Sequence, residues 1–490
     1  MPSTHLADSI AVHSREHAGR VALAGNRRTV TYGQLGDRTE ALRTALSGLG
    51  LPAGSTVCVP AHKTPETVAL LLAVFHEGLI ALAPSPDLGI AARTRLAQQA
   101  RASHTLTVSE TGALTAEAVD GGEEEAEGFD RADATRTRLL LTTSGSTGTP
   151  KIVPIPAEGF DAFADWATGE FELTRDDVAL SYAPLNFDLA LLDVWTFLRL
   201  GAQVVLVDKD RATDAPHLRN LVAGHGVTFV QGVPMLHRLL VQDGPEYAAV
   251  RTIVTTGDAL APELLRPMAD AFPKARFHNV FGCTETNDSF IHPIDPLGPA
   301  AAPPIGRPLA GVRAIVVDAD GELVTGAGTG ELLVSTPFQT AGYLRSALNE
   351  QAFTVRDGRV HYRTGDIVSR TDDGLYRLEG RADWQVKVRG VRTNLQEVET
   401  VVASHPDVAE AVVVALPDER TGVRLHAHVT RRPSTALTGL RLRTHVSGHL
   451  PRHAIPSSVH VTETPIPRTS TGKPDRNLIR NNRLKENGTA

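Results

Sequence analysis

The chain has 490 residues, of which 41% are hydrophobic and 21% are charged, and its formal net charge is −7. This length exceeds one ordinary hydrophobic core, so two or more domains are expected. The balance of apolar and charged residues excludes a disordered chain, and the negative charge argues against a general nucleic-acid binder. Only two cysteines are present, which excludes a disulfide framework or a cysteine metal site and favours a reducing cytoplasm.

Targeting and membrane segments are not expected in this sequence. The N-terminal residues lack a basic start followed by an apolar run, so no signal peptide is predicted. The most apolar stretch, residues 68–75, is far shorter than the ~20 residues that a membrane-spanning helix needs. A buried helix followed by a strand explains this stretch better, and no membrane partner is expected.

Strands and helices are predicted to alternate along the first part of the chain. Helices are expected at residues 35–49 and 64–75, and then at 189–200, 235–241 and 262–271. Short apolar runs rich in β-formers lie at residues 139–141, 178–181, 204–207, 227–230, 253–254 and 277–281. This alternation predicts an α/β fold with a largely parallel sheet that is covered on both faces.

The pattern changes twice after the parallel sheet. Residues 311–378 read as short strands with Gly and Asp turns, which predicts an antiparallel or barrel-like part with a hairpin turn at 372–374. The residues from about 384 onward have their own apolar periodicity and are long enough for a small α+β domain. Residues 111–136 are acidic and poor in large apolar groups, and we interpret them as a solvated excursion.

Two glycine-containing motifs point to phosphate chemistry. Residues 142–151 read TTSGSTGTPK, a loop whose backbone N–H groups and hydroxyls can wrap phosphate oxygens. It is not a Walker loop, because no Gly-Lys-Ser/Thr follows at the required spacing. Residues 469–476 read TSTGKPDR, and Lys473 can add a point charge where negative charge builds up. Taken alone, the first motif could also be a flexible surface loop.

Three further motifs place carboxylates and an aromatic ring after predicted strands. In NVFGCTET, residues 279–286, Glu285 could hold Mg²⁺ and Phe281 could stack on a base. In YRTGD, residues 362–366, Asp366 after a glycine turn could bind a ribose diol. Arg381 in GRAD could serve phosphate or ribose. Each lone charged residue is otherwise explained by a surface ion pair worth ~0–1 kcal/mol.

Taken in order, these motifs resemble those of the adenylate-forming superfamily, and within it the amino-acid adenylation domains of the nonribosomal peptide synthetase type. The resemblance runs from about Val30 to Arg476. It implies a large N-terminal domain, residues 1–382, in which parallel αβ sheets are joined by a barrel-like β part. It also implies a small α+β lid domain, residues 383–490, with a hinge at Asp383.

The resemblance implies a two-step reaction. Mg-ATP and an amino acid first give aminoacyl-AMP and pyrophosphate, and the phosphopantetheine thiol of a separate carrier protein then takes the aminoacyl group. Lys473 would bridge the substrate carboxylate and the α-phosphate region, Thr284 would lie near the α-phosphate, and Glu285 would hold Mg²⁺. The other ATP-binding residues would be Thr143, Ser144, Gly145, Ser146, Thr147, Gly148, Lys151, Asn279, Phe281, Asp366 and Arg381.

The nature of the substrate depends on Asp188. By resemblance its carboxylate pairs with the α-ammonium group, which favours an amino acid over an acyl or aryl acid; alternatively, Asp188 caps the helix that follows. The side-chain pocket would be lined by Leu189, Leu192, Gln231, Val254, Thr256, Val280, Asp288 and Ser289. This mostly aliphatic wall suggests a small or medium side chain, such as that of glycine, alanine or proline. A carboxylate of Asp288 inside the pocket would better suit a hydroxyl or cationic side chain, whereas outside it would be a surface group.

Some positions depart from the family pattern. Residues 335–341 replace a glycine-and-arginine run before Gly342 and Tyr343, residues 393–396 replace a more acidic stretch, and Cys283 stands where proline is common. Only a short polar tail follows Arg476, so a stand-alone ligase of natural-product, including antibiotic, biosynthesis is expected. The alternatives are an acyl- or aryl-CoA ligase, a ligase for a β-amino acid, and a catalytically silent adenylate-binding protein.

Overall fold

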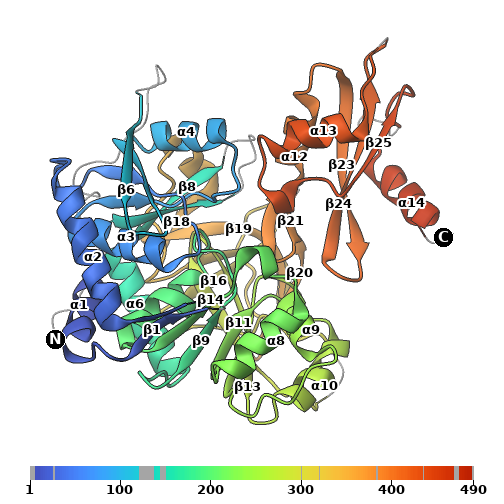
Figure 1. Cartoon of the computed structure of the whole chain (residues 1–490). Helices are drawn as coiled ribbons and strands as arrows, with labels where there is room; N and C mark the ends of the chain where they lie inside the picture. The colour runs from blue at the N-terminus through green and yellow to red at the C-terminus, as the bar shows by residue number, and fades with distance from the viewer. Residues whose placement is uncertain are drawn as a thin grey trace. The chain divides into compact units, whose positions relative to one another are not determined.

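The computed structural model describes residues 6–25, 28–120, 137–143, 150–298, 301–318, 320–381, 385–433, 435–467 and 474–487. The chain forms two compact units (Figure 1). The larger unit comprises Met1–Ser85, Ala97–Thr142 and Ile152–Ala382, and the smaller one comprises Pro86–Leu96, Thr143–Lys151 and Asp383–Ala490. None of the described helices combines the length and the apolar character that crossing a bilayer requires.

A nine-stranded sheet forms the centre of the larger unit, with the order β15-β14-β13-β12-β11-β9-β10-β1-β2. The six strands from β13 to β1 in this order run parallel, and β14, β15 and β2 pair antiparallel at the edges. The strands are β1 (Val21–Ala24), β2 (Thr29–Thr31), β9 (Val178–Ser181), β10 (Gln203–Leu206), β11 (Phe229–Gly232), β12 (Thr252–Thr255), β13 (Arg276–Cys283), β14 (Asn287–Ile294) and β15 (Arg307–Pro308). The parallel sheet that was predicted from the alternating pattern is therefore confirmed.

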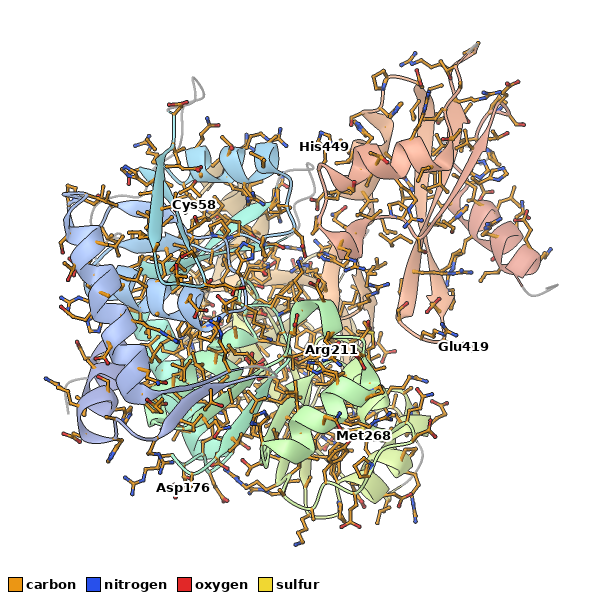
Figure 2. The ribbon with its side chains drawn as sticks, in the orientation of Figure 1. Cys58, Asp176, Arg211, Met268, Glu419 and His449 are labelled. Carbon is orange, nitrogen blue, oxygen red and sulfur yellow. The ribbon has the colours of Figure 1, made fainter. Side chains whose placement is uncertain are left out.

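Successive residues of these strands face opposite sides of the sheet, as the period of two requires. Leu180, Val230 and Ile253 pack in one core with α8 (Ala215–Gly224), α9 (Pro234–Val241) and α10 (Pro262–Ala271). Met268 of α10 is fully buried in this core (Figure 2). On the other face, Phe229 and its neighbours pack in a second core with α1 (Leu6–Glu16), α2 (Tyr32–Ser47), α6 (Ala157–Glu170) and α7 (Phe197–Leu200).

The helix expected at 189–200 is irregular in the structure. A π-helix, η1 (Leu191–Thr196), precedes the short α-helix α7, and every residue of η1 is buried. Thr196 donates its hydroxyl to the carbonyl of Leu191, five residues earlier, at 2.7 Å. The π-helical stretch directly follows the segment that carries Asp188, and such bulges are frequent near functional sites.

A six-stranded sheet has the order β6-β5-β3-β4-β7-β8. Its strands are β3 (Thr56–Cys58), β4 (Ile80–Leu82), β5 (His104–Val108), β6 (Leu114–Ala118), β7 (Thr137–Thr143) and β8 (Lys151–Pro156), and the neighbouring helices are α3 (Pro65–His76) and α4 (Ile90–Gln99). Nine residues of α3 are buried, which confirms the buried helix followed by a strand. The expected solvated excursion contains an edge strand, β6, whose residues pair with β5 and are half-buried or exposed. Its acidic centre at 121–136 lies outside the described residues.

The barrel-like part is confirmed as an antiparallel five-stranded sheet. It consists of β16 (Arg313–Val317), β17 (Gly328–Ser335), β18 (Phe353–Arg356), β19 (Arg359–Arg370) and β20 (Tyr376–Arg381), with the short helices η3 (Ser346–Leu348) and α11 (Asn349–Ala352) before β18. The predicted hairpin turn joins β19 to β20. Gly374 there has φ +78°, and its N–H donates to the carbonyl of Thr371 at 2.9 Å.

The part of the smaller unit from residue 385 onward is an α+β fold, as predicted. Its elements are β21 (Gln385–Val388), β22 (Val391–Asn394), α12 (Leu395–Ala403), β23 (Val408–Asp418), β24 (Gly422–Arg431), α13 (Gly439–Ser447), η4 (Arg452–Ala454), β25 (Ser458–Thr462) and α14 (Arg476–Asn487). Asn394 caps α12 by accepting hydrogen bonds from the N–H groups of Gln396 and Glu397 at 2.7 and 3.1 Å. The unusual sequence at 393–396 thus serves a helix cap.

Candidate active site

The carboxyl ends of four parallel strands bring the predicted substrate residues to one edge of the large sheet. Gln231 of β11 pairs in register with Val254 of β12, and β12 pairs with β13, which carries Val280. The side chain of Phe229 packs in the second core, so Gln231, two residues on, faces the same side of the sheet. Val254 and Val280 belong to that core as well. Ligands of open α/β sheets bind at this kind of edge.

The wall residues share a buried position but differ in hydrogen bonding. Leu192, Val254 and Val280 are apolar and nearly inaccessible, whereas Leu189 is half-buried. Thr256 is buried, and its backbone N–H donates to the carbonyl of Gly232 at 3.0 Å. Within the described part of the chain, the buried Oε1 of Gln231 accepts no hydrogen bond.

Asp188 lies on the turn between β9 and η1. Its Oδ1 accepts a hydrogen bond from the backbone N–H of Leu189 at 3.0 Å. Burial raises the pKa of the Asp188 carboxyl, and the charge of Glu285 raises it further, while hydrogen bonds from the Thr284 side chain and the backbone lower it. The cap position of η1 is Ala190, without a side-chain cap. Asp188 is therefore not the N-cap residue of η1, and its carboxylate remains a candidate to bind the substrate ammonium group.

A buried lysine anchors the strand end before Asp188. Lys63 donates from Nζ to the carbonyl oxygens of Ser181 and Ala183 at 2.5 and 2.7 Å. Burial lowers the pKa of Lys63 and raises that of Asp193 in η1, and the attraction between the two groups opposes both shifts. The hydrogen bonds of Lys63 therefore hold the end of β9, and its charge acts on Asp193 in η1, on the other side of the Asp188 turn.

The β13–β14 hairpin carries Thr284 and Glu285 at its tip. Gly282 is required there, because a Cβ atom at this position would come within 2.3 Å of the carbonyl oxygen of Asn287. The Glu285 carboxylate is 2% exposed and accepts a hydrogen bond from the hydroxyl of Tyr343 at 2.5 Å. A buried carboxylate held in this way is a fixed negative charge at the carboxyl edge of the sheet.

The sequence left open whether the Asp288 carboxylate lies inside the pocket or at the surface. In the structure, Asp288 lies on β14 opposite Gly282. Burial raises the pKa of its carboxyl to about 7, and the negative charge of Asp188 contributes to that rise. A surface group would not be desolvated in this way. Asp288 is half-buried, and the influence of Asp188 on its pKa indicates that the two carboxylates lie within electrostatic range of each other. Its neighbour Ser289 is fully buried and donates its hydroxyl to Thr286 and to the carbonyl of Asn287, both at 3.1 Å.

The residues expected to contact adenine lie in well-packed positions. Asn279 donates from Nδ2 to the carbonyl of Pro304 at 2.7 Å. Phe281 is 6% exposed and packs edge-to-face on Phe290, with 5.8 Å between the ring centroids.

The sequence suggested that the ribose candidate Asp366 follows a glycine turn. In the structure, Asp366 lies within β19 instead. Gly365 before it has φ +68°, and the β17–β19 pairing shifts register in this region. Asp366 is 5% exposed, and its N–H donates to the hydroxyl of Thr364 at 3.0 Å. It pairs across the strands with Arg381, whose side chain lies outside the described residues. The positive φ of Gly365 explains why glycine precedes the aspartate.

Several predicted site residues lie outside the part of the chain that the structure describes. They are Ser144, Gly145, Ser146, Thr147, Gly148, Lys473 and the expected hinge residue Asp383. The two ends of the phosphate loop are described. Thr143 ends β7, and its buried hydroxyl has no partner among the described residues, while Lys151 begins β8 and is half-buried.

The sequence analysis missed the residues that hold the site in shape. Tyr343 follows a noted departure from the family pattern, but nothing local indicated its contact with Glu285, 58 residues away. Lys63 lies among polar residues and gave no signal, whereas Asp193 is a charge within an otherwise apolar run. Such a charge in an apolar run is the one feature that could have suggested a buried pair.

Comparisons with known proteins agree with this geometry. Residues 10–344 match the AMP-binding enzyme family, and residues 397–473 match the AMP-binding enzyme C-terminal domain family. The L-proline–[L-prolyl-carrier protein] ligase of Streptomyces coelicolor is 31% identical over 504 residues, which cover 94% of this chain and 93% of that protein.

Two other similarities differ in coverage. Phenyloxazoline synthase MbtB of a Mycobacterium species (strain MCS) is 32% identical over 471 residues, or 94% of this chain, but the chain spans only 40% of that protein's length. The solved structure of NpsA-ThdA, an artificially fused adenylation-PCP di-domain from Klebsiella oxytoca, superposes with a TM-score of 0.79. It is 24% identical, with 94% of each chain covered, and it therefore supports the fold alone.

Proposed function

Because the chain belongs to the AMP-binding enzyme family, we propose that it is a ligase that activates an amino acid as aminoacyl-AMP and transfers the aminoacyl group to a separate carrier protein. The observation that carries the proposal is the half-buried Asp188 carboxylate, held by Leu189 and Thr284 beside Glu285. The similarity to a protein named as a carrier-protein ligase over nearly its whole length supports it. Natural-product biosynthesis in the cytoplasm is the proposed setting.

In the first step, the substrate carboxylate oxygen attacks the α-phosphorus of ATP, and the bond to the β-phosphate oxygen breaks to release pyrophosphate. The two reactants are anions, so positioning and charge screening supply most of the acceleration. Lys473 would neutralise part of this repulsion, and residues 143–148 with Lys151 would hold the leaving pyrophosphate. Thr284, whose hydroxyl already bonds to Asp188, would link the amino-acid and phosphate ends of the site.

Mg²⁺ is the metal that the donor set fits best. Glu285 offers a buried carboxylate with hard oxygen donors, and the Tyr343 hydroxyl fixes one of its oxygens. Among the residues that the structure describes, no group of three or more His, Cys, Asp or Glu side chains could form a complete metal site. Mg²⁺ is usually held by one or two carboxylates together with substrate phosphates, and it would stabilise the charge that develops on the phosphate oxygens.

In the second step, the reaction takes place at the carbonyl carbon of the aminoacyl-AMP, and Lys473 must no longer lie beside it. The thiol sulfur of the carrier arm attacks the carbonyl carbon, the bond to the AMP oxygen breaks, and the thiol proton leaves to solvent. We propose that residues 383–490 form a lid that turns at Asp383 and withdraws Lys473 between the steps. One mobile element can thus serve two reactions.

The polar groups of the pocket favour an amino acid over an acyl or aryl acid. Asp188 is a half-buried carboxylate whose desolvation is offset when an ammonium group binds. Asp288 lies within electrostatic range of Asp188, so a side chain that ends in a hydrogen-bond donor, a hydroxyl or an ammonium group, suits it better than a purely aliphatic one. The apolar walls of Leu192, Val254 and Val280 limit that side chain to a small or medium size.

Substrate-dependent ATP–pyrophosphate exchange tests this function. The panel should contain neutral, hydroxylated and cationic α-amino acids, β-amino acids, and fatty and aromatic acids. We expect exchange with one or a few amino acids and none with acids that lack an amine. Exchange driven only by fatty or aromatic acids would establish the CoA-ligase alternative, and tight ATP binding with no exchange would establish a catalytically silent protein.

A further inference from the structure

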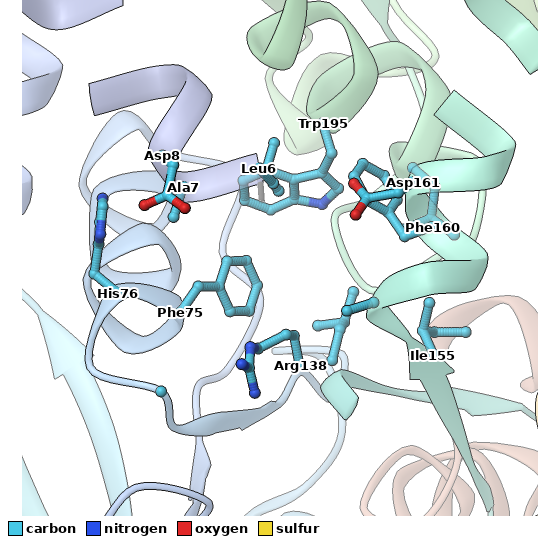
Figure 3. A pocket seen from close by; sticks show the side chains of 14 residues that line it. Leu6, Ala7, Asp8, Phe75, His76, Arg138, Ile155, Phe160, Asp161 and Trp195 are labelled. Carbon is cyan, nitrogen blue, oxygen red and sulfur yellow. The ribbon is translucent and has the colours of Figure 1, made fainter. Parts of the chain in front are cut away.

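The larger unit contains a cavity that the residues of the candidate active site do not line. It has a volume of about 220 Å³ and lies between α1, α3, α6 and η1 (Figure 3). The rings of Phe75, Phe160 and Trp195 turn toward its interior. Asp8 on its rim is exposed, so the cavity reaches the surface at α1.

Among the charged side chains that line the cavity, Arg138 is the cation that has no carboxylate partner within the described part of the chain. The carboxylate of Asp161 faces another residue, because its Oδ1 lies 4.0 Å from Nε of Arg199. Burial and the charge of Arg43 lower the pKa of His76, which favours its neutral form, while Asp8 opposes this shift. Arg138 donates only to the carbonyl of its neighbour Thr137, at 3.4 Å, and forms no ion pair within the described part of the chain. An arginine fork placed beside apolar rings is well suited to bind a carboxylate.

The size of the cavity limits the ligand. An apolar cavity of about 150 Å³ binds benzene, and a water molecule occupies about 30 Å³ of liquid. A volume of about 220 Å³ therefore holds one aromatic ring and a substituent of roughly two further polar atoms. Aromatic rings in the wall favour edge-to-face contacts with such a ring.

We propose that this cavity is a binding site for a small aromatic carboxylate, with its ring between Phe75, Phe160 and Trp195 and its carboxylate on the Arg138 guanidinium. The site is separate from amino-acid activation and does not depend on the function proposed above. It shares η1 with that function, because η1 supplies Leu191 and Trp195 to the cavity and begins three residues after Asp188. It also shares β7 and β8, which supply Arg138 and Ile155 to the cavity and carry Thr143 and Lys151.

The test measures binding of 4-fluorobenzoate to the whole protein by ¹⁹F NMR, with the amide 4-fluorobenzamide as the neutral comparison. We expect saturable binding of the acid, at least ~10-fold weaker binding of the amide, and a matching change in tryptophan fluorescence that Trp195→Phe removes. Arg138→Gln should weaken the acid ~10-fold or more, because a charge-assisted hydrogen bond is lost. Arg313→Gln is the matched control, since this exposed arginine on β16 lies outside the cavity lining.

Two further experiments distinguish binding in this cavity from binding in the active site. Ala157→Phe should block binding by filling the cavity from the start of α6, and pyrophosphate exchange by this variant reports whether it still folds. Saturating ATP and amino acid should not displace the acid, and Asp188→Asn should still bind it. Displacement by the amino acid, equal affinity for acid and amide, or unchanged binding by Arg138→Gln would each overturn the proposal.

Discussion

Replacing Asp288 with asparagine should remove a loss of folding stability that the wild-type protein suffers as the pH rises. Burial and the charge of Asp188 raise the pKa of Asp288 from 3.8 to about 7 in the folded protein. The folded state therefore holds a proton that the unfolded state has released, and stability falls as pH rises between these two values. At about 1.4 kcal/mol per pH unit, the loss approaches ~4 kcal/mol above pH ~7 as an upper limit.

The assay compares thermal unfolding midpoints of the wild type and Asp288→Asn from pH 4 to pH 8. The asparagine has nearly the same shape but does not titrate, so the variant should gain on the wild type steadily up to pH ~7 and keep a constant advantage above it. Asp320→Asn, at an exposed aspartate, is the control, and its curve of unfolding midpoint against pH should run parallel to that of the wild type. Parallel curves for Asp288→Asn as well would show that its carboxylate is solvated and does not face the site.

Three other substitutions probe different parts of the site. Lys473→Ala should slow adenylation by ~10²–10³-fold, measured by pyrophosphate exchange, but impair transfer from supplied aminoacyl-AMP much less; equal damage to both steps would contradict its role. Tyr343→Phe removes a charge-assisted hydrogen bond to Glu285 worth about 1.5–3 kcal/mol, so the KM for Mg-ATP should rise ~10-fold or more, and an unchanged KM would show that the carboxylate is positioned by other groups. Lys63→Met should destabilise the protein by about 3–5 kcal/mol, and adding Asp193→Asn should restore part of this loss in thermal unfolding; strictly additive effects would exclude the buried pair.

The parallel sheet could be predicted because it depends on local patterns, whereas the wall residues of the site were carried over from the family resemblance and remain a prediction. A strand such as Val178–Ser181 shows its apolar run directly, and strand alternation places Gln231, Val254 and Val280 on one face. The family motifs added the expected roles of individual residues. In these parts the sequence carries the information within a few neighbouring residues.

The supports of the site could not be predicted, because they join residues far apart in the chain. The Tyr343–Glu285 hydrogen bond and the Lys63–Ser181 contact span 58 and 118 residues. The raised pKa of Asp288 follows from burial and from the charge of Asp188, neither of which is visible in the sequence. The edge strand β6 was missed because its acidic, alternating residues are typical of a solvated loop as well.

The most direct measurement is exchange by the wild type and Asp188→Asn with the preferred amino acid and with its analogue in which hydrogen replaces the amine. We expect the wild type to prefer the amino acid by at least ~100-fold, and the variant to lose most of that preference while its ATP affinity stays within about twofold. A variant that keeps the full preference would contradict the assignment of Asp188 to the ammonium group, and with it the central claim that this site selects amino acids.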